Sequence, residues 1–252
     1  MASPLIQIER LHKSFNDLKV LKGVDITIER GESIVVIGQS GCGKSVLIKH
    51  VIRLLEPDKG RVLFDGEDLA ELNAKQITAV RRRVGMLFQS AALFDSLSVV
   101  ENVGLGLKES RRYDSSRINE IVLEKLELVG LTEAAWKSPA ELSGGMRKRV
   151  GLARAIAYDP EMLLYDEPTT GLDPVTADMI NSLVVDLNRQ LNVTSIAVTH
   201  DMKSAFRIAS RIIMLYDGQV EIDATPDEIR KSDNPVVKQF ITGSATGPII
   251  VR

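Results

Sequence analysis

The feature that most constrains this chain is a glycine-rich loop set between a strand and a helix. Residues Gly38 to Ser45 follow the spacing of a glycine, four residues, and then Gly-Lys-Ser. The apolar run at 33–37 predicts a buried parallel strand before the loop, and apolar residues recurring at 46–55 predict a helix after it. In this context the backbone N–H groups of the loop converge on an anion, and the following helix adds its positive end. We therefore predict a site for the phosphates of a nucleoside triphosphate.

Two side chains of this loop have distinct chemistry. We expect Lys44 to reach the phosphate oxygens and the Ser45 hydroxyl to ligate Mg²⁺. The glycines let the backbone approach the phosphates closely, which a Cβ would block. The predicted phosphate-binding residues are Gly38, Gln39, Ser40, Gly41, Cys42, Gly43, Lys44 and Ser45.

Composition limits the classes of function. With 252 residues, 44% of them hydrophobic and 26% charged, the chain is typical of a soluble globular protein of one large or two small domains. A net charge of −2 gives no overall attraction to nucleic acid, and the sequence has no apolar run of about 18 residues that could span a membrane. We expect any work at a membrane to require a partner.

Cysteine usage and the first residues favour the cytoplasm. The single cysteine, Cys42, cannot form an internal disulfide, and we interpret it as a small side chain tolerated in a tight turn rather than as a redox group. The start of the chain, where Leu5-Ile6 is followed by Gln7, Glu9 and Arg10, does not resemble a secretory signal peptide.

The remaining sequence predicts strands that alternate with helices. This order favours a mostly parallel sheet with a helical insertion between two of its segments. The expected strands are 24–29, 63–66, 84–88, 162–165, 195–199 and a hairpin at 212–222, and the expected helices are 118–129, 144–157 and 174–190.

An acidic pair ends one of these strands. Asp166 and Glu167 directly follow the apolar residues 162–165. Beside a phosphate loop, Asp166 would hold Mg²⁺ through a coordinated water and Glu167 would polarise the attacking water as a general base. The acidic pair alone is weak evidence for a catalytic site, but together with Lys44 and Ser45 it predicts hydrolysis of the nucleotide.

A second glycine-rich sequence, Leu142-Ser143-Gly144-Gly145-Met146, stands at the start of a predicted helix. It forms another candidate anion-binding helix N-terminus. Because one γ-phosphate does not need two such cradles from a single subunit, we interpret Ser143 and Gly145 as binding the nucleotide held by another copy. The alternative is an ordinary capped helix start.

In this order the motifs resemble those of the ATP-binding subunits of ABC transporters, across residues 5 to 225. One position departs from the family's pattern, because the fifth residue of the signature is usually Gln and is Met146 here. Ser143 and both glycines are retained, so we expect nucleotide contact to persist. The resemblance rests on the loop Gly38–Ser45, Gln89 after its strand, the signature Leu142–Met146, Asp166-Glu167, Gly171-Leu172-Asp173, and His200 after its strand.

The resemblance implies roles for further residues. Phe15 would stack on adenine, the alternative being a core Phe, and Gln89 would sense Mg²⁺ and the γ-phosphate. His200 would contact the γ-phosphate and orient Glu167, whereas His12 and His50 have no such context. The implied catalytic residues are Glu167 and His200, the metal ligands are Ser45, Gln89 and Asp166, and the nucleotide contacts beyond the loop are Phe15, Gln89, Ser143, Gly144, Gly145 and Asp173, the last lying across a dimer interface.

The resemblance also implies a fold and an assembly. We expect an α/β P-loop NTPase with a RecA-like core, an antiparallel β portion and a helical insertion at about 91–158. An ATPase domain at 1–225 would be followed by a C-terminal extension at 226–252. Two copies would sandwich two ATP molecules head to tail and drive a bound permease.

Shorter motifs narrow the family further. The sequence from Phe88 to Phe94, Met146 in the signature and the tail at 240–248 are similar to the Mla-type phospholipid transport ATPases. That similarity implies a homodimer bound to an integral membrane permease, an MCE-domain lipid-binding protein and, in some systems, a STAS-domain subunit, with no nucleic acid. The chain would lie peripherally at the cytoplasmic face of the inner membrane. The alternatives are the ATPase of a small-solute importer, for example for amino acids, and a soluble ABC ATPase without a transport role.

The last residues predict a mobile arm with an apolar tip. The segment 243–247 is rich in small residues and too flexible for a core, and the apolar residues 248–251 follow it. This arrangement suggests docking on a neighbouring subunit. The alternative is a frayed terminus.

Overall fold

The computed structural model describes residues 3–250, which form two compact units. Unit 1 holds the chain up to Val80 and again from Ile196, and unit 2 holds Arg81–Ser195. Unit 2 is therefore inserted in the sequence of unit 1. The division into an ATPase domain at 1–225 and an extension at 226–252 stays a prediction. Among residues 3–250, no helix has both the length and the apolar character needed to cross a membrane.

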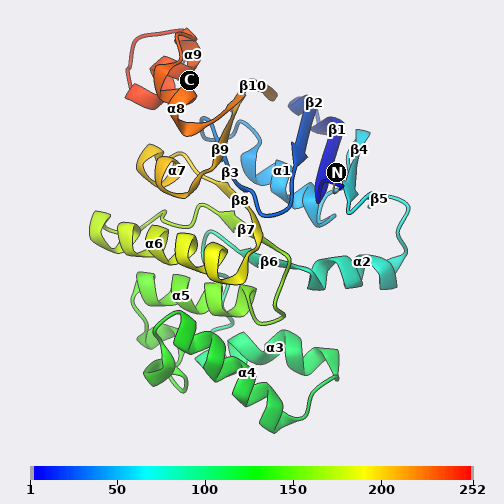
Figure 1. Ribbon diagram of the computed structural model, residues 1–252, viewed down its shortest axis with the longest axis vertical. Coiled ribbons are helices and arrows are strands. Elements are labelled where there is room, and N and C mark those ends of the chain that lie inside the picture. The colour runs from blue at the N-terminus through cyan, green and yellow to red at the C-terminus, as the bar shows by residue number, and fades with distance from the viewer. Residues whose placement is uncertain (1–2, 251–252) are drawn as a thin grey trace. The chain divides into compact units, whose positions relative to one another are not determined.

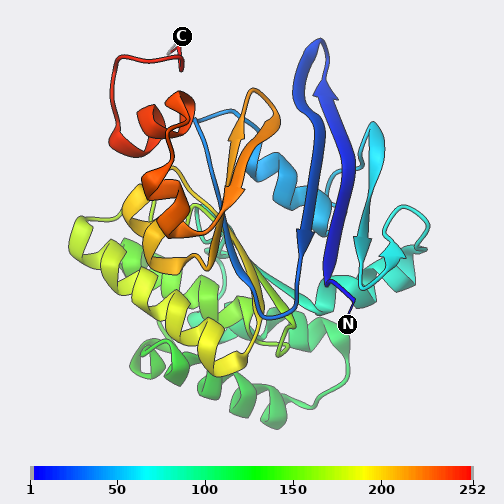
Figure 2. The ribbon, with the colours of Figure 1, turned by 45° about the horizontal axis from the view of Figure 1, so that its top comes forward.

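Unit 1 contains an antiparallel sheet built on a long hairpin. The strands pair in the order β2-β1-β4-β5, and Figure 2 shows β1 and β2 as the long blue hairpin with the shorter β4 beside β1. The predicted alternation is present in β2, where Val24, Ile26 and Ile28 are buried and the residues between them are exposed. The strands are β1 (Ile6–Phe15), β2 (Leu18–Ile28), β4 (Lys59–Phe64) and β5 (Glu67–Asp68).

Unit 1 also contains the strand that leads into the glycine-rich loop. β3 occupies the predicted residues, and all residues from Ile34 to Ile37 are buried, as expected for a strand covered on both faces. β3 pairs in parallel with β9, and β9 turns at Asp217 and Gly218 into antiparallel β10, which confirms the predicted hairpin. The elements are β3 (Ser33–Ile37), α1 (Lys44–Val51), β8 (Thr194–Val198), α7 (Met202–Ile208), β9 (Arg211–Tyr216) and β10 (Gln219–Ala224), the unit boundary falling within β8.

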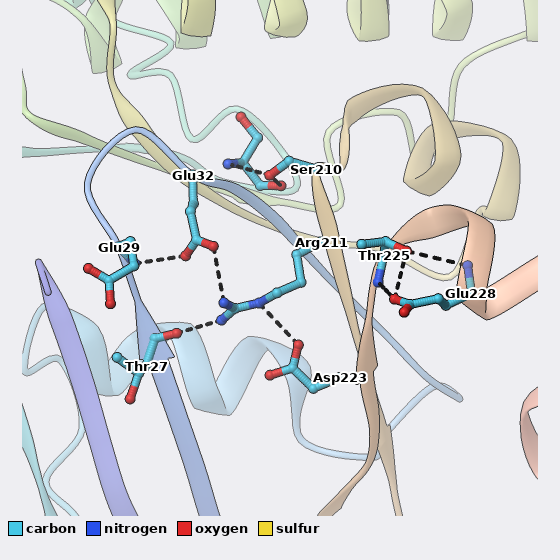
Figure 3. A network of polar contacts seen from close by, with 9 residues as sticks. Thr27, Glu29, Glu32, Ser210, Arg211, Asp223, Thr225 and Glu228 are labelled. Atoms are coloured by element: carbon cyan, nitrogen blue, oxygen red, sulfur yellow. Dashed lines mark hydrogen bonds and ion pairs between the residues drawn. The ribbon is translucent and has the colours of Figure 1, made fainter.

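A network of polar contacts holds the start of β3 (Figure 3). Arg211 at the start of β9 donates from Nη1 to Glu32 Oε1 at 3.1 Å and from Nη2 to the Thr27 carbonyl at 2.5 Å. Its Nε lies 3.0 Å from Asp223 Oδ1 on β10. Burial raises the pKa of the Asp223 carboxyl, and the charge of Arg211 lowers it. One guanidinium thus connects β2, β9 and β10 at the end of β3 that lies opposite the glycine-rich loop.

Unit 2 combines two parallel strands, β6 and β7, with helices. Helices α3, α4 and α5 pack against one another (Figure 1). Ser98 and Glu101 form a capping box at the start of α3, and the buried Asn102 side chain accepts from Phe94 N at 2.8 Å and donates to its carbonyl, which fixes the preceding loop. The elements are β6 (Val84–Leu87), α3 (Val99–Ser110), α4 (Ser115–Leu128), η1 (Thr132–Ala134), η2 (Pro139–Glu141), α5 (Gly144–Ala155), β7 (Met162–Asp166) and α6 (Pro174–Leu191).

The predicted strands and helices of unit 2 are confirmed with small differences at their ends, but other helices are missing from the prediction. Helix α2 buries only Ile77 and Val80, which is too little for a visible apolar pattern. Helices α8 and α9 are short and are marked by caps and N-terminal prolines rather than by periodicity. The helices without a predicted range are α2 (Ala74–Arg82), α3 (Val99–Ser110, within the predicted helical insertion), α7 (Met202–Ile208), α8 (Pro226–Lys231) and α9 (Pro235–Thr242).

The prediction of a mobile C-terminal arm is wrong for the described part of the tail. The Gln239 side chain of α9 donates to the Ser244 and Ile249 carbonyls at 3.2 Å each and accepts from Ile249 N at 2.6 Å. Tyr216 donates to the Pro248 carbonyl at 3.3 Å. The tail therefore folds back on unit 1 with Ile249 buried, while Ile250 is exposed. The apolar residue at 251 lies outside the described residues.

Candidate nucleotide site

The phosphate loop of unit 1 begins where β3 ends and continues into α1. Gly38 has φ 148° and Gly43, the N-cap of α1, has φ 104°. A Cβ at Gly38 would lie 2.4 Å from the Leu215 carbonyl oxygen, and one at Gly43 would lie 2.8 Å from the Leu21 side chain. Glycine is required at these two positions because the loop packs tightly on β9 and β2. This reason adds to the predicted one, which was close approach to a phosphate.

Lys44 is folded across its own loop. Its Nζ donates to the Gly38 carbonyl at 2.8 Å and to the Gln39 carbonyl at 2.9 Å, and the residue is 6% exposed. Both partners are neutral carbonyl groups, and an anion would be a stronger acceptor for this buried amine than they are. Ser45 follows in the first turn of α1 and is half-buried. The loop residues therefore fit the phosphates of a nucleotide.

Cys42 behaves as the sequence predicts. Burial raises the pKa of its thiol above the ordinary range, while the charge of Lys44 lowers it. A reactive cysteine needs the opposite balance, because the thiolate is the nucleophile. Cys42 is thus a small side chain within a turn.

Phe15 and His200 are both in unit 1 and both accessible. Phe15 ends β1 and is 42% exposed, so the alternative of a core Phe is wrong, and Lys13 Nζ lies 5.7 Å from its ring centroid. His200 is exposed and lies two residues after the end of β8, next to Thr199, whose N–H donates to the Val36 carbonyl at 3.1 Å. Both side chains are thus at the surface of unit 1.

The other histidines of unit 1 contact the backbone. A ring nitrogen of His12 lies 2.7 Å from the Arg10 carbonyl, and one of His50 lies 2.8 Å from the Val46 carbonyl. His50 is buried in α1. Both contacts are typical of structural histidines.

The acidic pair belongs to unit 2. Asp166 is the last residue of β7 and Glu167 follows it, and both are buried. Glu167 has φ 50°, in the left-handed region, which is uncommon for a residue other than glycine and is associated with functional sites. Thr170 Oγ1 donates to Glu167 Oε2 at 3.0 Å. The backbone and the carboxylate of Glu167 are therefore both restrained.

Lys148 is a residue of this site that the sequence does not predict. It lies on α5 and is 5% exposed, and its Nζ donates to the Gln89 carbonyl at 2.5 Å and to the Glu167 carbonyl at 3.0 Å. Burial lowers the pKa of its ammonium, and the charges of Glu167 and Asp166 raise it. The available sequence signal is weak, because a lysine between two arginines on a helix usually marks a solvated face.

Gln89 is exposed at the end of β6, and the loop that follows it is strained. Ala91 has φ 61° and Ala92 has φ 47°. Arg154 of α5 donates from Nη2 to the Ala91 carbonyl at 2.6 Å and from Nη1 to the Ala92 carbonyl at 2.7 Å. Lys148 and Arg154 together thus hold the loop 89–92 from one helix.

The signature residues start a helix in unit 2. Ser143 is the exposed N-cap of α5 and accepts from Met146 N at 3.2 Å. A Cβ on Gly145 would lie 2.5 Å from Thr176 Cγ2, so packing against α6 already requires glycine there. The chain by itself has the ordinary capped start, and contact of Ser143, Gly144 and Gly145 with a second copy's nucleotide stays a prediction.

Asp173 also has a local role. It is the N-cap of α6 and accepts from Val175 N and Thr176 N at 3.0 Å each. Hydrogen bonds from Thr176 and from Val175 lower the pKa of its carboxyl. Its place across a dimer interface stays a prediction.

The predicted residues thus divide between the two units. Unit 1 carries Phe15, the loop Gly38–Ser45 and His200, and unit 2 carries Gln89, the signature, the acidic pair and Asp173. Within unit 2, Lys148 brings the main chains of Gln89 and Glu167 together. This order of motifs along the chain allows a direct comparison with known families.

Residues 21–170 match the family model described as ABC transporter. The chain belongs to the ABC transporter family. Among its relatives is the Probable ribonucleotide transport ATP-binding protein mkl of Mycobacterium leprae, 41% identical over 97% of this chain and 70% of that protein. The Intermembrane phospholipid transport system ATP-binding protein MlaF of Haemophilus influenzae is 39% identical over 99% of this chain and 94% of that protein.

Solved ABC structures have the same fold. The dimeric structure of a post-hydrolysis state of the ATP-binding cassette MJ0796, bound to ADP and Pi, superposes with a TM-score of 0.79. It is 33% identical and the match covers 87% of this chain and 98% of that one. The predicted family and the α/β P-loop ATPase fold are confirmed, and the chain is an ATPase of the ABC family.

Proposed function

We propose that this chain hydrolyses ATP to drive an Mla-type ABC transporter of phospholipid. The observation that carries the lipid assignment is the similarity to MlaF of Haemophilus influenzae over nearly the whole length of both chains. The similarity to mkl, named for ribonucleotide transport, supplies a second candidate cargo. The residues proposed to bind and hydrolyse ATP are the same for either cargo.

Nucleotide binding begins at the phosphate loop. The backbone N–H groups of Gly38–Ser45 and the Lys44 ammonium hold the β- and γ-phosphates, and Phe15 stacks on the adenine. The support is the buried Lys44 Nζ, which has two carbonyl oxygens and no carboxylate within hydrogen-bond distance in the described chain. Phosphate oxygens would replace those carbonyls as stronger, charged acceptors.

The residues proposed for Mg²⁺ are Ser45, Gln89 and Asp166. Hydroxyl, amide and carboxylate oxygens are the donors that this hard cation prefers. Burial of Asp166 at the end of β7 supports a role other than solvation. When bound, Mg²⁺ supplies positive charge that offsets the charge of the phosphates.

Glu167 takes the proton of the attacking water as the general base, and His200 contacts the γ-phosphate and orients Glu167 and the water. Ser143, Gly144, Gly145 and Asp173 of a second copy complete each site. Two observations support this arrangement. The Glu167 main chain is held in a strained conformation, and MJ0796 forms a dimer.

The proposed partners are a second copy of the chain and an integral membrane permease. An MCE-domain lipid-binding protein and a STAS-domain subunit complete the assembly, and nucleic acid has no part in it. The chain would sit peripherally on the cytoplasmic face of the inner membrane. The name of the Haemophilus influenzae relative, which describes an intermembrane phospholipid transport system, supports a role in phospholipid transport.

The test is purification of the tagged full-length chain from detergent-solubilised membranes, followed by mass spectrometry of co-purified proteins and lipids. We expect a multispan permease, an MCE-domain protein and bound phospholipid. ATP hydrolysis by the purified complex should rise when phospholipid is supplied. Stimulation by ribonucleotides or amino acids instead, or recovery of the chain without any membrane protein, would contradict the lipid assignment.

A further inference from the structure

Lys148 makes two contacts that no role assigned so far explains. Its ammonium is buried within unit 2, where it donates to the carbonyl of Gln89 and to the carbonyl of Glu167. We propose that Lys148 is a positioning residue for ATP hydrolysis, which fixes the main chain of Glu167 and of Gln89 from the signature helix α5. The inference rests on the proposed function, in which Glu167 is the general base.

The conformation of Glu167 explains why such a contact is needed. A non-glycine residue at φ 50° is strained and persists only where its surroundings impose it. The Lys148 donor fixes the Glu167 carbonyl at 3.0 Å, and Thr170 Oγ1 fixes its carboxylate at 3.0 Å. These two contacts restrain the backbone and the carboxylate of Glu167. Loss of the first would let the peptide relax and move the base.

The same ammonium reaches the loop that begins at Gln89. The 2.5 Å contact fixes the Gln89 carbonyl, and Arg154 then binds the carbonyls of Ala91 and Ala92, both of which have positive φ. Residues 89–92 are therefore held by α5 at both ends. Arg154 reaches only this loop, whereas Lys148 is bonded to the loop and to Glu167.

The cost of burying a lysine indicates that its hydrogen bonds have a role at this position. Burying an ammonium is costly unless hydrogen bonds compensate for lost water, and a methionine of similar length would fill the same space without that cost. A lysine here supplies donors that an apolar side chain lacks. Its charge also acts favourably on Asp166 and Glu167, two buried carboxylates.

The position of Lys148 on α5 gives the contact a further consequence. Ser143 caps this helix five residues earlier, about 7.5 Å along its axis. Lys148 therefore connects the helix capped by Ser143 to the main chains of Glu167 and Gln89. If a second copy's nucleotide binds at Ser143, the helix that carries this contact also carries the donor to the Glu167 carbonyl.

The test uses the full-length chain with Mg²⁺ and ATP. We expect Lys148→Met to lower kcat by about 10²-fold, the usual effect of misplacing a reacting group by about 1 Å, with KM and ATP affinity changed less than about 3-fold. The matched control is Arg149→Met, because Arg149 is next on the helix and donates to the Val129 and Gly130 carbonyls instead. The control should retain most of the wild-type kcat.

A double-mutant cycle separates positioning from a general loss of structure. In a Glu167→Gln background, Lys148→Met should lower the single-turnover rate far less than the roughly 10²-fold expected in the wild-type background, because the base is absent and only the effect through the Gln89 carbonyl remains. If the two losses multiply, or if Lys148→Met turns over like wild type, the proposal is overturned. Should Lys148→Met not fold, Lys148→Gln is measured in the same cycle with the same criteria. A wild-type chain without Mg²⁺-dependent hydrolysis would instead refute the proposed function, and this inference with it.

Discussion

At the scale of single residues, the strongest chemical assignment is Glu167. Its buried carboxylate follows β7, and its strained backbone is held by Lys148. The sequence predicts the role, because an acidic pair after a strand accompanies the phosphate loop. The sequence does not predict the backbone strain at Glu167 or the contacts of Lys148, because both depend on segments that are far apart in the chain.

Glu167→Gln should retain ATP binding and lose most turnover, because a neutral amide cannot take the proton of the attacking water. The expected loss in kcat is of order 10²–10⁴. An ATP-stabilised dimer should appear on size exclusion, where wild type returns to monomer after hydrolysis. Near-normal hydrolysis by this variant would remove Glu167 from the mechanism.

His50 should make stability depend on pH. Burial lowers its pKa below the ordinary 6.5, although the Val46 carbonyl raises it, with smaller effects of Lys13, which lowers it, and of Glu56 and Asp58, which raise it. Between the lowered value and 6.5 the unfolded state binds more protons than the folded state, so stability falls as pH decreases through this window. The free energy of unfolding in urea should therefore fall less steeply from pH 7.5 to 5.5 in His50→Leu than in wild type. Parallel slopes in that range would contradict the prediction, and pH 8 to 9 provides the reference.

At the scale of elements, predictability follows the strength of the apolar pattern. β3 matches its prediction residue for residue, because a continuous apolar run stops at a glycine. Helix α2 is missing from the prediction because it buries only Ile77 and Val80. The prediction of a mobile tail is wrong because the tail is held by Gln239, a polar side chain whose partners lie up to ten residues away in the sequence.

Gln239→Leu should release the tail from α9. The variant loses hydrogen bonds to Ser244 and Ile249 that are worth roughly 1 kcal/mol each. Amide hydrogen exchange should then become fast at 244–250 while α9 stays protected. Tyr216→Phe, which removes only the 3.3 Å contact to the Pro248 carbonyl, serves as the control and should change little. Unchanged protection at Ile249 in Gln239→Leu would show that other contacts hold the tail.

At the scale of the whole molecule, the proposed site needs groups from two copies of the chain. The order of motifs in the sequence identifies the family, because each motif lies on a strand, loop or helix that can be predicted locally. It cannot give the assembly, because Ser143 and Asp173 also have complete local roles as helix caps. A single chain is consistent with both interpretations of the signature, so the decisive observation must involve two copies.

Ser143→Arg should abolish hydrolysis while sparing ATP binding by the monomer, because the proposed contact of Ser143 is to the nucleotide of the other copy. Mixing it with Lys44→Ala gives heterodimers with one intact composite site and one doubly damaged site. The mixture should regain activity that neither variant has alone, by steady-state ATP hydrolysis at equal total protein. Removal of the α5 cap costs about 1 kcal/mol, so the unfolding temperature of Ser143→Arg is measured alongside. If Ser143→Arg instead loses ATP binding as severely as Lys44→Ala, Ser143 acts within its own chain and the head-to-tail dimer is wrong.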